Sequence, residues 1–293
     1  MTQVPTRPPR LASTLILLSA HPETGVVMVA LLRRSQSARF LPGALVFPGG
    51  AIEDQDHLII EDSMNKAVVK DALSDHQAWG IDDPRDAARS LGAALRETEE
   101  ESGLSIAMLI SEAQSLRCVG HWLTPEVLKT RFDTYFWAAE LSSDHVLATL
   151  NVDGVEIERG EWINPSDVLR AYERAEIDLP APTLCIISEL AELIDQVSKR
   201  QSPTNDFEGQ VTIISELILT LSQAAHAHPI CPVLDKTQGV RLYLPGDPNY
   251  AHKRGDEPRV DSTSFWCTGS HYLERVASNP LNDNSPSIWR RIT

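Results

Sequence analysis

The stretch RETEEESGL, residues 96–104, sets four glutamates within five consecutive positions behind an arginine, and FPGGAIEDQD, residues 47–56, ends a hydrophobic run in a glycine turn. On a helix, the side chains of Glu97, Glu100 and Glu101 share one face, because residues three and four positions apart are neighbours. Like charges at that spacing repel, and the arginine relieves only part of the repulsion. Two explanations are open: a solvated acidic face, or a cluster of oxygen ligands for Mg²⁺ or Mn²⁺.

The residues before this acidic cluster predict a long helix. Asp83 is suited to the N-cap, Pro84 to the first helical position, and Gly103 to the C-terminal stop. An apolar stripe at helical spacing runs between these signals and consists of Ala87, Leu91, Ala94, Leu95 and Thr98. We therefore expect the glutamates in the last turns of a helix whose other face is buried.

The rest of the chain alternates strand-like and helix-like patterns. Runs rich in β-branched, leucine and aromatic residues predict strands at 11–19, 26–33, 44–50, 116–122, 132–141 and 155–163. Amphipathic patterns predict helices at 164–176, 183–199 and 211–227. The polar, acidic segment 54–83 is interpreted as an insertion, in which one helix is possible at about 62–73; its closure entropy is small if it loops out on the surface.

Composition excludes two classes of partner. The formal net charge of −15 argues against a nucleic-acid-binding protein, since such proteins neutralise phosphates with clustered Lys and Arg. The sequence contains no apolar run near the roughly 20 residues that cross a bilayer, so we expect no membrane partner. A small anionic substrate stays compatible with this charge, provided that a cation mediates the contact.

The stretch RETEEESGL, residues 96–104, resembles the second half of the Nudix box. The box is written Gly-x5-Glu-x7-Arg-Glu-U-x-Glu-Glu-x-Gly-U, where U is a bulky hydrophobic residue. Leu104 matches the last hydrophobic position, and Thr98 matches the first one weakly. FPGG is similar to the strand end and glycine turn that open the box. This resemblance covers roughly residues 11–170 and implies a Nudix α/β/α sandwich with a mixed β-sheet.

The resemblance also implies roles for the matching residues. It implies that the metal-binding carboxylates are Glu97, Glu100 and Glu101. Arg96 would orient one of them through a salt bridge. The backbone of two glycines, Gly49 and Gly50, would approach the metal. Glycine suits that place because only a residue without Cβ allows the close approach. Glu99 is expected to point toward solvent.

This sequence departs from the box in the spacing of its two halves. The box separates its glycine from its arginine by 13 residues, whereas 45 residues lie between Gly50 and Arg96. Counting back eight positions from Arg96 puts Ala88 in the place of the first box glutamate, so the insertion is expected to displace that residue. A long insertion inside the box, together with the sequences around it, resembles the Nudix subgroup that hydrolyses coenzyme A.

Further candidate residues lie outside the box. In the family, a general base often comes from a later strand or loop, and Glu156 and Glu158 are the candidates here, with a polar rim on an exposed strand as the equally open alternative. Three arginines are candidate ligands of substrate phosphate, because guanidinium groups match phosphate oxygens. These are Arg33, Arg34 and Arg131, and a structural ion pair is the alternative for each.

These observations give one expected function and two alternatives. The chain is interpreted as a Mg²⁺- or Mn²⁺-dependent Nudix hydrolase that cleaves a diphosphate linkage in a nucleotide conjugate. The expected substrate is coenzyme A or acyl-coenzyme A. The alternatives are a diphosphatase for ADP-ribose or NADH, and a catalytically silent Nudix-fold nucleotide sensor. The expected organisation is a Nudix domain at 11–170 and a helical and irregular C-terminal extension, 171–293, packed on the same core. The family resemblance makes a homodimer a possible assembly. The expected location is the cytoplasm.

Overall fold

A computed structural model describes the chain at residues 8–38, 41–63, 66–126, 128, 130–142, 150–152, 154–200, 207–223, 229–235, 241–244, 272–277 and 287–292. Much of the predicted C-terminal extension, 171–293, therefore lies outside the described residues. Within the described residues, no helix combines the length and the apolar character that crossing a membrane requires.

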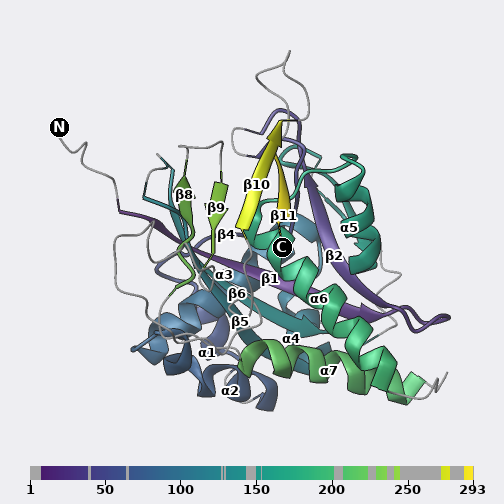
Figure 1. Cartoon of the computed structure of the whole chain (residues 1–293). Coiled ribbons are helices and arrows are strands. Elements are labelled where there is room, and N and C mark those ends of the chain that lie inside the picture. Colours follow the sequence, from purple (N-terminus) through teal and green to yellow (C-terminus); the bar gives the residue numbers. More distant parts are fainter. Residues whose placement is uncertain are drawn as a thin grey trace.

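A mixed sheet forms the centre of the molecule (Figure 1). Its strand order is β3-β2-β1-β6-β5, with β4 paired to β1 and β7 paired to β2; β1 and β6 run parallel and the other pairs run antiparallel. The strands are β1 (Arg10–Ala20), β2 (Val27–Arg34), β3 (Leu45–Val46), β4 (Gly49–Ala51), β5 (Ser115–Leu123), β6 (Phe132–Glu140) and β7 (Ile157–Ile163).

Helices cover both faces of this sheet. They are α1 (His57–Glu61), α2 (Ala67–Ser74), the 3₁₀ turn η1 (His76–Trp79), α3 (Pro84–Ser102), α4 (Ile106–Glu112), α5 (Pro165–Glu173), α6 (Ala181–Arg200) and α7 (Phe207–Gln223). A second, four-stranded sheet contains β8 (Val233–Asp235), β9 (Arg241–Tyr243), β10 (Tyr272–Ala277) and β11 (Ser287–Ile292). The predicted α/β/α sandwich is confirmed.

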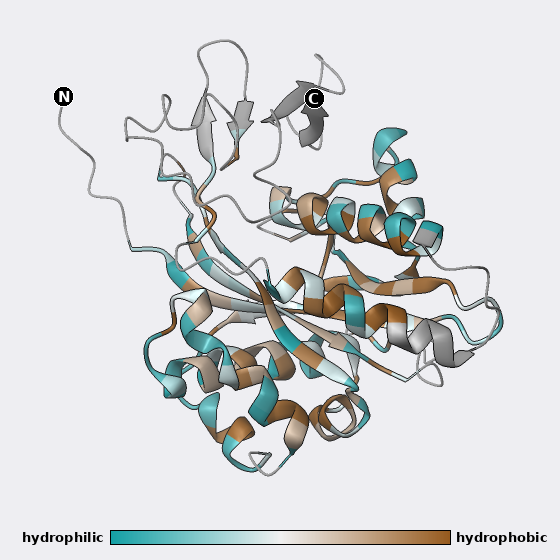
Figure 2. Cartoon of the chain, turned by 60° about the horizontal axis from the view of Figure 1, so that its bottom comes forward, coloured by the Kyte–Doolittle hydropathy of each residue, from teal (hydrophilic) through white to brown (hydrophobic). Residues whose placement is uncertain are grey.

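The sheet has a hydrophobic core on each of its faces, and the alternation of side chains along β1 explains why one strand contributes to both. Leu15 and Leu17 belong to one buried cluster, whereas Ile16 and Leu18 belong to the other. Successive side chains of a strand point to opposite faces, so a strand buried on both faces has a continuous apolar run. In Figure 2, the central strands and parts of the flanking helices are hydrophobic, whereas the loops and many outer helix turns are hydrophilic.

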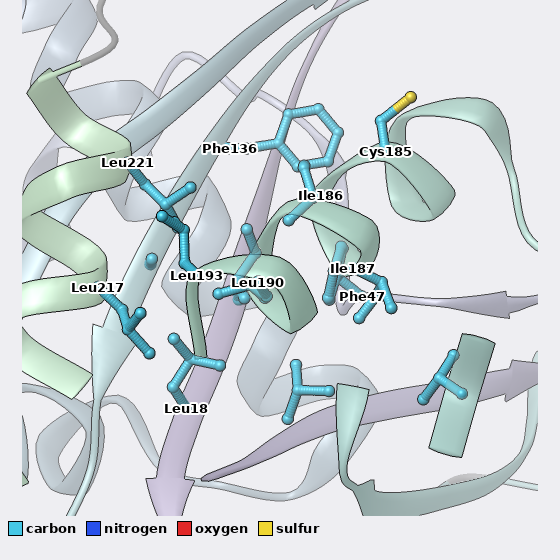
Figure 3. Packing of buried hydrophobic residues seen from close by; sticks show 14 of the residues in the cluster. Leu18, Phe47, Phe136, Cys185, Ile186, Ile187, Leu190, Leu193, Leu217 and Leu221 are labelled. Atoms are coloured by element: carbon cyan, nitrogen blue, oxygen red, sulfur yellow. The ribbon is translucent and has the colours of Figure 1, made fainter. Parts of the chain in front are cut away.

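The helices α6 and α7 close one of these cores. Figure 3 shows leucine and isoleucine side chains from both helices meeting side chains of the sheet, with Leu18 of β1 and Phe136 of β6 among them. Ile187 and Leu190 of α6 are completely buried. The opposite core is covered by α3, which leaves the second half of α3 beside the turn between β3 and β4.

The insertion is folded and packs against the rest of the chain. Its residues form α1, α2 and η1, which pack against α3 and β5 and bury Ile60, Val69 and Trp79. The helix predicted at about 62–73 corresponds to α2, which begins later than expected, at Ala67, and ends at Ser74. The apolar residues of this segment are too sparse to show a clear helical period in the sequence. They are buried by contact with neighbouring elements.

Candidate active site

The second half of α3 carries the predicted carboxylates. The helix begins at an N-cap, Asp83, whose side chain accepts a hydrogen bond from the Arg85 N–H at 2.8 Å, and it ends before Gly103, whose φ is +73°. Both helix signals predicted from the sequence are confirmed. Glu97 is 17% exposed and Glu100 59% exposed, so the acidic face extends from the protein interior to solvent.

Gly49 and Gly50, expected in a turn, begin strand β4 instead, and this start of β4 (the glycine turn of the sequence) lies against two of these carboxylates. The Gly49 N–H donates a hydrogen bond to Oε2 of Glu101 at 3.0 Å. A Cβ built on Gly50 would lie 2.5 Å from both carboxylate oxygens of Glu97, which is closer than real Cβ contacts come. The pairing of β4 with Ser13 and Thr14 of β1 holds the turn at this place.

Arg96 lies at the centre of the site. Its Nη1 donates to Oε1 of Glu97 at 2.8 Å and lies 3.6 Å from Oε2 of Glu100. Its Nη2 also donates to the Ala51 carbonyl oxygen at 2.9 Å. The guanidinium therefore ties the acidic face of α3 to the end of β4.

Asp56 completes this arrangement and was missed in the sequence analysis. Arg96 donates from Nε to Oδ1 of Asp56 at 2.8 Å and from Nη2 to Oδ2 at 3.2 Å, and the aspartate is 1% exposed. The hydrogen bond to this carboxylate is the main reason that the pKa of Arg96 lies above its ordinary value. Asp56 stands six positions after Gly50, so counting the box forward from its glycine finds an acidic residue in the first glutamate position. Counting backward across the insertion had put Ala88 there instead.

Burial changes the acidity of the two inner glutamates. Burial raises the pKa of Glu101 to about 7; the Gly49 N–H and the charge of Arg34 oppose this shift, whereas the charges of Glu97 and Glu156 add to it. Burial also raises the pKa of Glu97, against the stabilising contact with Arg96. Carboxylates held together away from water therefore favour a partner of positive charge, either a proton or a metal cation.

The remaining predicted residues divide into two groups. Arg34 and Glu156 lie close enough to Glu101 to change its pKa. By contrast, Arg33 donates to the Gly43 carbonyl oxygen at 3.2 Å and Arg131 to the Thr124 carbonyl oxygen at 3.1 Å.

Glu158 does not share the surroundings of Glu156. Its Oε1 accepts a hydrogen bond from the Gln36 N–H at 3.0 Å. On a regular strand, residues two positions apart share a face. Here β7 begins at Ile157, after Glu156, and the pairing of β7 with β2 shifts its register between Arg33 and Arg34.

The donor set is suited to a hard divalent cation. Within the described residues, no three His, Cys, Asp or Glu side chains are grouped in a way that would hold a metal ion. Mg²⁺ is nonetheless usually bound through one or two carboxylates together with water and substrate phosphate. Glu97 and Glu101 supply such carboxylates, and the missing Cβ of Gly50 lets the Glu97 carboxylate lie against the backbone of β4.

Comparisons with known proteins agree with this architecture. No protein-family model matches the chain. The acyl-coenzyme A diphosphatase NUDT19 of Xenopus laevis is 24% identical over 230 residues, covering 55% of this chain and 59% of the relative, so the chain spans less than two thirds of that relative's length. A solved NUDIX hydrolase of Alicyclobacillus acidocaldarius has a TM-score of 0.50 at 22% sequence identity, covering 71% of this chain and 97% of that chain. The predicted resemblance to the Nudix hydrolases and the predicted fold are both confirmed.

Proposed function

We propose that the chain is a metal-dependent Nudix diphosphohydrolase that cleaves a diphosphate linkage in a nucleotide conjugate. The observation that carries the proposal is the contact network around Arg96, which gathers Asp56, Glu97 and the glycine turn at one end of α3. Repelling glutamates at helical spacing destabilise a helix unless a cation compensates them. A protein that only binds nucleotides has no need of such a cluster.

The chain's own residues would hold and orient the reacting groups. Glu97 and Glu101 would hold Mg²⁺ or Mn²⁺, with Glu100 at the exposed edge of the site. When bound, such a cation screens diphosphate charge and makes a water molecule more acidic. Arg96 orients Glu97, and the Gly49 N–H orients Glu101.

A general base can come from two places. Glu101 is the first candidate in the metal-free protein, where burial raises its pKa to about 7; a cation bound to its carboxylate would lower that pKa and leave the base to another residue. Glu156 is the other candidate, because its charge acts on Glu101. The Glu158 carboxylate accepts a hydrogen bond from the Gln36 N–H.

Coenzyme A or acyl-coenzyme A is the proposed substrate. Two observations support it: the long insertion inside the box, and the similarity to a relative named an acyl-coenzyme A diphosphatase. Of the three candidate arginines, Arg34 is the best placed to meet a substrate phosphate, because its charge acts on the Glu101 carboxylate.

A substrate panel tests the proposal. Purified protein with Mg²⁺ or Mn²⁺ is offered coenzyme A, acyl-coenzyme A, ADP-ribose, NADH and dinucleoside polyphosphates, and phosphate-containing products are separated by chromatography. We expect the highest kcat/KM with a coenzyme A compound, and loss of turnover when EDTA removes the metal. Binding without turnover of any compound would favour the sensor, and a preference for ADP-ribose or NADH would favour the other diphosphatase.

Gly50→Ala tests the close approach at the glycine turn. The added Cβ would meet the carboxylate of Glu97, so we expect a decrease of roughly 10- to 100-fold in kcat, the range seen when residues supporting a metal site are replaced. The matched control is Gly120→Ala on β5, where a Cβ would make only a 3.4 Å contact with Phe136. Equal kinetics of the two variants would contradict the role given to Gly50.

A further inference from the structure

A turn formed by residues 51–57 lies along one face of α3. Four residues of α3 at positions i, i+4, i+7 and i+11 meet it, which is the spacing of a single helix face. Arg85 lies 3.0 Å from the His57 ring nitrogen Nε2, and Arg89 pairs with Asp54 at 2.8 Å and donates to the Glu53 carbonyl oxygen at 3.4 Å. Gly92 and Arg96 continue the same line toward the active site.

Gly92 is the point at which this turn comes closest to the helix. A Cβ built on Gly92 would overlap the carbonyl oxygen of Asp56 and lie 2.7 Å from its carbonyl carbon. Both are backbone atoms and cannot be rotated away as a side-chain end can. Alanine is the better residue for a helix interior, so the helix itself gives no reason for glycine here. The backbone of Asp56 gives that reason.

The depth of this contact decides where the Asp56 carboxylate lies. The same residue whose carbonyl rests on Gly92 makes the two hydrogen bonds to Arg96, at 2.8 and 3.2 Å. Its Oδ2 also accepts from the Glu53 N–H at 2.7 Å, which closes the turn. A methyl group at position 92 would push this backbone outward, and the paired geometry with Arg96 could not be kept.

The insertion holds the turn from its other side. α1 begins at His57, directly after Asp56, and its Ile60 is completely buried in the core that α3 covers. The Nδ1 of His57 lies 2.8 Å from the Asp54 carbonyl oxygen. The turn is therefore fixed between the helix below it and the inserted helix that follows it.

We infer that Gly92 is a positioning residue of the active site: by admitting the Asp56 backbone onto α3, it sets the Asp56–Arg96 pair and, through Arg96, the carboxylate of Glu97. The inserted helices serve the site by holding this turn in place. The effect on catalysis rests on the proposed diphosphohydrolase function, whereas the effect on the geometry does not.

Gly92→Ala is the first test. We expect kcat to decrease roughly 10- to 100-fold, as for other residues that support a metal site. The Tm should fall as well, although the same change at an unobstructed helix position raises it. Asp56→Asn should lower kcat by a similar factor. Asp54→Asn is its matched control, since Asp54 lies in the same turn and pairs with Arg89 but is fully exposed; its kcat should stay within about twofold of the wild type.

The double variant separates positioning from general destabilisation. If Gly92 acts through the Asp56–Arg96 pair, Gly92→Ala should change kcat little in the Asp56→Asn background, because the pair is already lost. Multiplicative effects of the two changes, or a Gly92→Ala variant that is fully active and more heat-stable than the wild type, would overturn the inference.

A crystal structure of Gly92→Ala distinguishes failure of this inference from failure of the proposed function. If the wild type hydrolyses no diphosphate, the distances from Arg96 to Asp56 in the variant still give the answer. Separation of the two side chains supports the inference, and distances unchanged from 2.8 and 3.2 Å refute it.

Discussion

Replacing Glu101 by glutamine is expected to lower kcat for diphosphate hydrolysis by roughly 10²- to 10⁴-fold. Glutamine keeps the shape of the side chain and can still accept the hydrogen bond from the Gly49 N–H. It removes the anionic oxygens that would bind a cation or take a proton. The expected result is therefore loss of charge at an otherwise intact site, and the folded structure should be retained.

Glu99→Gln is the matched control for this prediction. It removes the same charge from the same turn of α3, but Glu99 is exposed and its Oε1 accepts from the Ile106 N–H at the start of α4. We expect its kcat within about twofold of the wild type. Mn²⁺ affinity, measured by calorimetry, should fall for Glu101→Gln and stay unchanged for Glu99→Gln. If both variants keep wild-type turnover, the site has been assigned to the wrong residues.

The features that the sequence predicted well are those set by local chemistry. The ends of α3 are set by the N-cap Asp83 and by Gly103, and its buried face is set by the apolar stripe between them. All of these signals lie within the helix or next to it, so neighbouring residues are enough to predict it. The strand predicted at 11–19 likewise follows from its own run of apolar residues, and it corresponds to β1. The outward direction of Glu99 followed from the helical period alone, and the structure confirms it.

The features that were missed depend on contacts between distant segments. Asp56 pairs with a residue 40 positions away, and no local pattern marks it as buried. The inserted helices are stabilised by α3 and β5 rather than by their own periodicity. The surroundings of Glu158 follow from a register shift in the pairing of β2 with β7, which is decided by two strands together. Counting the box motif forward from Gly50 was the one available signal for Asp56.

Glu140 gives a large expected dependence of stability on pH. It is the last residue of β6 and is 1% exposed, and its carboxylate accepts a hydrogen bond from the Ser215 hydroxyl of α7. Burial raises its pKa from 4.5 to about 7, while the bond from Ser215 acts in the opposite direction. Between these values, the folded protein keeps a proton that the unfolded chain has lost. The contribution of Glu140 to the free energy of unfolding is therefore fully present below about pH 4.5 and is lost as the pH rises through 7.

Glu140→Gln should remove this dependence, because the amide stays neutral at every pH. At pH 8 we expect the variant to be more stable than the wild type, by at most about 3 kcal/mol, and at pH 4.5 the two should differ little. Urea unfolding at several pH values in the presence of EDTA measures the difference, and subtracting one protein from the other cancels the similar contribution of Glu101. Glu216→Gln is the control, since Glu216 follows Ser215 on α7 but is exposed. A wild type and a Glu140→Gln variant with parallel pH profiles would show that Glu140 is already ionised in the folded protein, and that α7 packs over a carboxylate rather than a carboxylic acid.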